Sequence, residues 1–137
     1  MEPMTGPRRA LLDASVLIDY PADRVAEVAD ELAVSAITMA ELHYGVSASP
    51  DPLEQLRRRQ RLQLVNELYD VLPFDARTAE YYGALATALR SRGRNPRPRR
   101  MDLQIAATAA RHDLALITHN TADFAGLDET IEIIGLR

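Results

Sequence analysis

The stretch Leu11–Tyr20, LLDASVLIDY, places an aspartate where a buried strand is expected to end. Two leucines precede Asp13, and the chain is apolar again from Val16. Burying a carboxylate among such residues costs free energy unless the carboxylate has a partner. The identity of that partner therefore bears on both the fold and the function of the chain.

Outward from Asp13, short apolar segments alternate with longer segments that have helical spacing. Strands are expected at residues 9–13, 32–36, 70–74, 114–118 and 130–135. A short turn at 14–17 and helices at 25–31, 37–48, 51–69, 75–93 and 101–112 are expected between them, with Asp51 and Asp75 as N-caps. Strands separated by helices require crossover connections. The sequence therefore predicts an α/β fold, a three-layer α/β/α sandwich around a central, mostly parallel sheet.

The length and the residue types limit the other possibilities. A chain of 137 residues suits one domain, expected at residues 9–137 after a flexible N-terminal tail at 1–8, where Pro3, Gly6 and Pro7 disfavour regular structure. The absence of cysteine excludes disulfides and thiolate metal sites. The apolar run after the tail is too short for a signal peptide or a membrane span. A cytoplasmic protein without a membrane partner is therefore expected.

All 16 basic residues are arginine, and ten of them lie in two short segments, four in RRRQR at residues 57–61 and six in RSRGRNPRPRR at residues 90–100. The net charge of -4 argues against a nucleic-acid partner, but a local basic patch can still hold phosphate. The segment RRRQR, residues 57–61, is expected to be a solvated helix face. The loop RNPRPRR, residues 94–100, leads directly to Asp102 and is restricted by two prolines. We therefore expect phosphate contacts from this loop, at Arg94, Arg97, Arg99 and Arg100.

Four acidic residues lie where elements should meet at one edge of the predicted sheet. Asp13 ends the first strand and Asp123 follows the fourth, whereas Glu41 and Asp102 lie in the first turns of helices. In parallel α/β sheets, these positions share the carboxyl edge, where ligands bind. We expect both helical acids to face inward, beside stripes formed by Ile37, Ala40, Tyr44 and Ala48 and by Ile105, Ala106 and Ala109.

Three of the acids also have a purely structural interpretation. Asp13 could cap the turn after its strand, Asp102 could complement a helix dipole, and Asp123 could form an Asx turn. An inward Glu41 is harder to explain without a partner. Carboxylates gathered at one edge repel one another and raise some of their pKa values, unless a hard cation such as Mg²⁺ neutralises them. The pattern therefore favours a metal site shared by Asp13, Asp102 and the other two acids.

The same residues fall within motifs that resemble those of the PIN-domain ribonucleases, in particular the VapC-like toxins of toxin–antitoxin pairs. The ordered motifs D-x-S-x-L-I-D, A-E-L-x-x-G, D-x-x-I-A-A-x-A and T-x-N-x-x-D-F lie in a resemblance that runs from about Ala10 to Leu136. The resemblance implies a PIN-like fold and a catalytic quartet of Asp13, Glu41, Asp102 and Asp123, with Asp13 and Asp102 as the main metal ligands. It also implies supporting roles for Ser15, Thr118 and Asn120.

The activity implied by the resemblance is endonucleolytic cleavage of RNA by phosphodiester hydrolysis, with Mg²⁺ or Mn²⁺ as cofactor. Glu41 would then orient or deprotonate the attacking water. The resemblance further implies a homodimer and a small antitoxin that neutralises the toxin. A homodimer is also suggested by Tyr81, Tyr82, Leu85 and Leu89, because their apolar surface exceeds what one core stripe needs.

Three other functions fit the sequence less well. An aspartyl phosphatase would have a second aspartate two residues after Asp13, where Ser15 stands, and a phospho-receiver domain would need a lysine, which the chain lacks. A non-catalytic RNA- or protein-binding module on the same fold is the alternative from another class. The complete acidic quartet counts against this alternative.

Overall fold

The computed structural model describes residues 7–136, so the first six residues of the expected tail lie outside the described part of the chain. The strands are β1 (Arg9–Leu12), β2 (Glu31–Ser35), β3 (Asp70–Leu72), β4 (Ala115–Thr118) and β5 (Ile133–Gly135). The helices are α1 (Ala14–Ile18), α2 (Ala22–Val28), α3 (Ala36–Ala48), α4 (Pro52–Leu68), α5 (Ala76–Ser91) and α6 (Arg100–Arg111). Two 3₁₀ turns, η1 (Arg97–Arg99) and η2 (Thr121–Phe124), flank α6 and β4.

The five strands form one sheet in the order β3-β2-β1-β4-β5, and each neighbouring pair is parallel. The central strand β1 is followed by β2 on one side, whereas β4 joins its other side. This reversal of strand order creates a crevice at the carboxyl ends of β1 and β4, the usual ligand site of such sheets. A backbone hydrogen bond of 3.0 Å, donated by Asp13 N to Ile117 O, connects the two strand ends.

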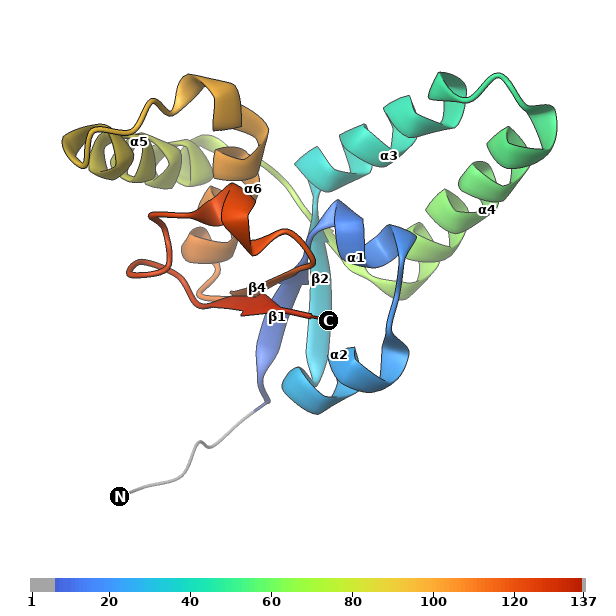
Figure 1. Ribbon diagram of the computed structural model, residues 1–137. Coiled ribbons are helices and arrows are strands. Elements are labelled where there is room, and N and C mark those ends of the chain that lie inside the picture. Colours follow the sequence, from blue (N-terminus) through green and yellow to red (C-terminus); the bar gives the residue numbers. More distant parts are fainter. Residues whose placement is uncertain (1–6, 137) are drawn as a thin grey trace.

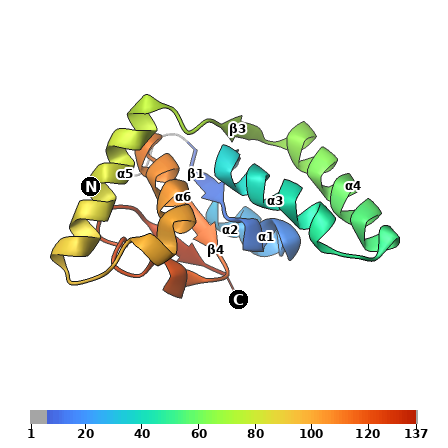
Figure 2. The same cartoon turned by 90° about the horizontal axis from the view of Figure 1, so that it is seen from above.

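Helices cover both faces of the sheet, which confirms the predicted three-layer α/β/α sandwich (Figure 1). Alternate residues of β1 point to opposite faces: Ala10 and Leu12 pack in the core beneath α1 to α4, and Leu11 packs in the core beneath α5 and α6. Figure 2 shows α3 and α4 side by side on one flank of β1, with α5 and α6 on the other. Within the described residues, no helix is both long and apolar enough to cross a membrane.

The helix starts follow from local capping chemistry. Asp51 accepts a hydrogen bond from Leu53 N at 3.1 Å ahead of Pro52, and Asp75 accepts one from Thr78 N at 2.9 Å, as predicted for both caps. At the other end of α5, Gly93 has a φ of +77°, which glycine adopts without steric cost. These residues set where α4 and α5 begin and where α5 ends.

The inward stripe predicted for α3 is wrong. Tyr44 is 76% exposed, and Ala40 and Ala48 are exposed too, whereas Thr38, Met39 and Leu42 are buried. The reason is that α3 packs against α4 as well as the sheet, so its apolar residues are not confined to one stripe. The stripe predicted for α6 is correct, because Ile105, Ala106 and Ala109 are fully buried.

The surface predicted for dimerisation is also wrong. Leu85 and Leu89 are only 3% and 1% exposed, and Tyr81 and Tyr82 pack against the core of their own chain. These side chains are covered because α5 packs along α6. A homodimer stays a prediction, without support from these four residues.

Candidate active site

Asp13 lies directly after β1 and is 7% exposed. Its Oδ2 accepts hydrogen bonds from the Ser15 hydroxyl at 2.9 Å and from the Thr118 hydroxyl at 2.7 Å. Its Oδ1 accepts one from Ala14 N at 2.9 Å, so Asp13 also caps α1. These three donors are the partners that a buried carboxylate requires.

The segment after β4 holds these two hydroxyl groups in place. The Ser15 hydroxyl accepts a hydrogen bond from His119 N at 3.1 Å, and the Thr118 hydroxyl accepts one from Asn120 N at 2.9 Å. Each hydroxyl therefore accepts a hydrogen bond from a backbone N–H and donates one to the carboxylate of Asp13. Within residues 7–136, the Asn120 side chain makes no hydrogen bond to any of the acids, so its contact with this network is through the backbone.

Glu41 lies in the second turn of α3, partly buried and directed toward the same crevice. Its Oε1 is buried and has no hydrogen-bond partner among the described residues. Burial, followed by the negative charges of Asp13 and Asp102, raises the pKa of Glu41 to about 7. A buried oxygen without a donor is available to a proton, a water molecule or a cation.

Asp102 lies in the first turn of α6, where it faces two of the other acids. Burial, followed by the charges of Asp123 and Asp13, raises the pKa of Asp102 to about 6. The positive charge of Arg99 opposes this shift. The four acids that the sequence places at one edge therefore lie within electrostatic range of one another.

Asp123 is exposed and lies in the turn η2, with its backbone N–H bonded to Asn120 O at 3.0 Å. Arg99 holds this turn from the other side. Its Nη1 donates to Ala122 O at 3.0 Å and to Asp123 O at 2.9 Å. These two bonds from Nη1 position the segment that carries Asp123, and the phosphate contact predicted for Arg99 stays a prediction.

The other arginines of the two basic segments differ in exposure. Arg92 bonds to Gly126 O and to Glu129 at 2.7 Å, which ties the end of α5 to the segment after η2. Three of the four predicted phosphate-binding residues are exposed, namely Arg94, Arg97 and Arg100. In α4 the predicted solvated face is correct for Arg57 and Arg59 and wrong for Arg58 and Arg61, which are partly buried.

The donor set suits a hard divalent cation, because it consists of carboxylates without thiolate or imidazole. As the side chains stand, no group of three or more acidic, histidine or cysteine residues in the part of the chain described converges closely enough to hold an ion. Repulsion keeps carboxylates apart when nothing neutralises them. A cation would therefore have to draw the acids together by side-chain rotation, and the unpartnered Oε1 of Glu41 is free to take part.

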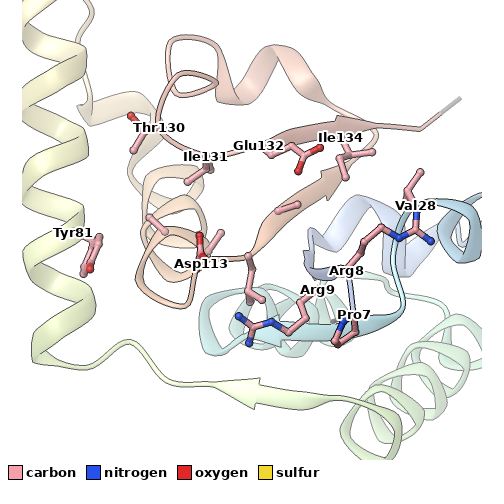
Figure 3. A pocket seen from close by; sticks show the side chains of 14 residues that line it. Pro7, Arg8, Arg9, Val28, Tyr81, Asp113, Thr130, Ile131, Glu132 and Ile134 are labelled. Carbon is pink, nitrogen blue, oxygen red and sulfur yellow. The ribbon is translucent and has the colours of Figure 1, made fainter. Parts of the chain in front are cut away.

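A larger cavity than any at the acids lies elsewhere among the described residues. It measures about 670 Å³ and lies where β1 and β4 begin, at the amino edge of the sheet. Figure 3 shows residues that line it, among them Arg9, Asp113 and Glu132, and Tyr81 of α5. The four acids are at the opposite edge of the sheet. Their raised pKa values and the unpartnered oxygen of Glu41 mark the candidate active site more specifically than cavity size does.

Comparison with known proteins agrees with this fold. Residues 10–129 match the family model of the PIN domain. The chain therefore belongs to the PIN domain family, as the motifs of the sequence predict.

The chain is also similar to individual proteins of this family. The chain is 36% identical over 135 residues to Ribonuclease VapC5 of Mycobacterium tuberculosis, covering 95% of this chain and 97% of that protein. A crystal structure of VapBC-5, a member of the VapBC family of toxin–antitoxin systems from the same organism, aligns with a TM-score of 0.83 and 34% identity over 95% of this chain and all of the other. VapBC2 from Rickettsia felis, bound to a DNA fragment from its promoter, aligns with a TM-score of 0.73 and 25% identity, covering 94% and 99% of the two chains.

Proposed function

We propose that this protein is the toxin of a toxin–antitoxin pair, a divalent-metal-dependent endoribonuclease that cleaves cellular RNA in the cytoplasm by phosphodiester hydrolysis. The observation that carries the proposal is the group of four carboxylates at the β1–β4 crevice, two with raised pKa values and one with an unpartnered buried oxygen. The similarity to Ribonuclease VapC5 over 95% of the chain supports the substrate class.

Asp13 and Asp102 would hold Mg²⁺ or Mn²⁺, with Asp123 as a further ligand. The bound cation would polarise the scissile phosphate and lower the pKa of water. Ser15 and Thr118 fix the Asp13 carboxylate through hydrogen bonds of 2.9 and 2.7 Å, so this ligand is oriented before anything binds. An all-oxygen donor set supports a hard cation over zinc.

Glu41 is the residue that would orient the attacking water or take its proton. A pKa of about 7 is suited to proton transfer near neutral pH. Its unpartnered oxygen leaves an acceptor free for that water. The exposed Arg94, Arg97 and Arg100 would contact the RNA backbone beside Asp102, and the Asn120 side chain, without a partner among the described residues, could face the scissile phosphate.

The proposed antitoxin would cover the acid cluster with a short tail. The VapBC-5 neighbour comes from a toxin–antitoxin system, which supports a partner of this kind. Carboxylates without a cation attract arginine, so a guanidinium from the tail would pair with the acids and compete with the metal. Exposed apolar side chains on α1 and α3, among them Ile18 at 57% and Tyr44 at 76% exposure, would contact the rest of the tail.

Brief induction of the protein in cells tests this function. Total RNA on a denaturing gel should show discrete cleavage products for the wild type and none for Asp13→Asn. Co-expression of the antitoxin should suppress the products. Intact RNA after induction of a folded wild type, or equal binding and function for wild type and Asp102→Asn, would favour the non-catalytic RNA- or protein-binding module instead.

A further inference from the structure

A second cavity, of about 200 Å³, lies between α3 and α4 and adjoins the acid cluster. Its wall contains Glu41 and Gly45 from α3 and Glu54, Arg58 and Arg61 from α4, so two acidic side chains line it beside the two arginines. We propose that this cavity binds a phosphate group of the RNA strand next to the scissile one, held by Arg58 and Arg61. The proposal rests on the proposed ribonuclease function and adds a binding site to it.

Arg58 is fixed before any ligand arrives. Its Nη1 donates to Gly45 O at 2.6 Å, and its Nε pairs with Glu54 at 3.1 Å. Glu54 also pairs with Arg57 at 2.7 Å, so its negative charge is shared between two arginines. A guanidinium held in this way loses little conformational freedom when it binds an anion, which favours binding.

Arg61 lies one turn further along α4 and lacks a partner. It is partly buried in the wall of the cavity, and it makes no hydrogen bond or ion pair with any residue between 7 and 136. A charge that is partly removed from water interacts more strongly with a counter-ion than a fully solvated charge does. Phosphate suits a guanidinium because its oxygens accept two parallel N–H bonds.

The charge distribution around the reaction centre explains why a phosphate is needed here. Four acids at the crevice repel the RNA backbone, so cations on either side must hold the strand in place. The exposed loop arginines lie on the α6 side, and the cavity lies on the α3–α4 side, with Glu41 between it and the other acids. Because RNA carries a phosphate at every nucleotide, a strand that places one phosphate at the acids offers the next one to this cavity.

Binding of a short labelled single-stranded RNA tests the proposal. The measurements use an Asp13→Asn background, which prevents cleavage, at several salt concentrations. Arg61→Ala should weaken binding about fivefold to tenfold and reduce the slope of log affinity against log salt by about 0.7. Arg59→Ala is the matched control, since Arg59 is exposed on the same helix and lies outside this cavity, and it should change the affinity less than twofold.

The outcomes separate this inference from the proposed function. Equal affinities for Arg61→Ala and Arg59→Ala, with RNA cleavage by the otherwise unmodified protein, would overturn the phosphate site alone. Failure of that protein to cleave RNA with any divalent cation would overturn both. An Arg61→Ala variant that binds RNA normally but loses affinity for the antitoxin would overturn the phosphate site in favour of a protein contact.

A steric variant tests the same cavity without changing charge. A Cβ added at Gly45 would meet no atom within 4 Å, so the helix accepts a larger side chain there, and Gly45→Leu should fill part of the cavity. Gly83→Leu, at an equally open glycine in α5, is the control. In the same Asp13→Asn background, Gly45→Leu should weaken RNA binding by at least threefold relative to Gly83→Leu, and equal affinities for the two would contradict the proposal.

Discussion

Residue by residue, the acids of the site differ in how well hydrogen bonds compensate the burial and mutual repulsion of their carboxylates. Asp13 accepts three hydrogen bonds from groups that other parts of the chain hold in place. Glu41 and Asp102 are partly buried instead, beside other carboxylates that raise their pKa values to about 7 and about 6. The metal-free protein is therefore destabilised whenever these two groups ionise.

The sign of the resulting pH dependence follows from linkage. Between its ordinary pKa of 4.5 and its folded value of about 7, Glu41 binds a proton in the folded chain that the unfolded chain has released. Stability from this group is therefore lost as the pH rises through that window, and Asp102 acts in the same direction between 3.8 and about 6. In chelator at about pH 8, we expect the free energy of unfolding of Glu41→Gln to exceed that of the wild type by on the order of 1 kcal/mol, after allowance for solvent screening. The variant should therefore unfold at a higher temperature.

Thermal unfolding at a series of pH values measures this difference. It should vanish at acidic pH, where Glu41 is protonated in both states, and Mg²⁺ at pH 8 should stabilise the wild type more than Glu41→Gln. The exposed Glu80 provides the control variant, Glu80→Gln, which should follow the wild type throughout. A Glu41→Gln effect that is independent of both pH and Mg²⁺ would show that Glu41 is not an unneutralised acid of the site.

Two arginines of one loop should respond differently to removal. Arg99→Ala removes hydrogen bonds to Ala122 O and Asp123 O, so it should lower the free energy of unfolding by about 1 kcal/mol and slow cleavage. Arg97 is exposed, and Arg97→Ala should leave the melting temperature unchanged while reducing the salt slope of RNA binding by about 0.7. Melting curves and RNA titrations of both variants would contradict this division if the two behaved alike.

At the scale of elements, chemistry local to the chain was predicted well. The starts of α4 and α5 are predicted by Asp51, which precedes Pro52, and by Asp75, because an N-cap depends only on its neighbours in sequence. The turns η1 and η2 were not predicted. The turn η2 is held by Arg99, which lies 23 and 24 residues from its two hydrogen-bond partners, and no local pattern encodes such a contact.

The segment after η2 depends on one glycine. Gly126 has a φ of +91°, and a Cβ there would lie 2.8 Å from Leu89 Cδ2. Gly126→Ala should therefore destabilise the protein by about 1–3 kcal/mol, through backbone strain and the clash with α5. Gly83→Ala, at a helical glycine with open space around it, should instead stabilise the protein by about 0.5–1 kcal/mol. Chemical denaturation measures both, and a Gly126→Ala variant as stable as Gly83→Ala would contradict the strained conformation.

At the scale of the whole molecule, strand order decides how much of the site could be predicted. Asp13, Glu41, Asp102 and Asp123 could be assigned to one edge from the sequence, because parallel strands with right-handed crossovers leave few alternatives. The cavity with Arg58 and Arg61 could not be predicted in this way. It depends on how α4 packs against α3, and residues 57–61 alone give no sign that two of their arginines are partly buried.

Assembly is the other property of the whole molecule that the sequence predicts. Because Leu85 and Leu89 of α5 are buried, and Tyr81 and Tyr82 are partly buried against the same core, a dimer would need other apolar surface. Helix α4 offers it, through Leu53, Leu56, Leu64 and Leu68, which are 46–63% exposed. Light scattering at tens of micromolar should give twice the mass of one chain, and Leu64→Glu should reduce it without lowering the melting temperature. A monomeric wild type would contradict the homodimer.

Cleavage of a defined RNA by the purified protein tests the metal-dependent site at the β1–β4 crevice most directly. We expect cleavage in Mg²⁺, none in chelator, and recovery when Mg²⁺ is restored. Asp102→Asn should lose at least a hundredfold in rate and remain folded, whereas Asp128→Asn, at an exposed acid outside the site, should cleave like the wild type. Undiminished cleavage in chelator, or by a folded Asp102→Asn, would contradict a metal-dependent site at the β1–β4 crevice.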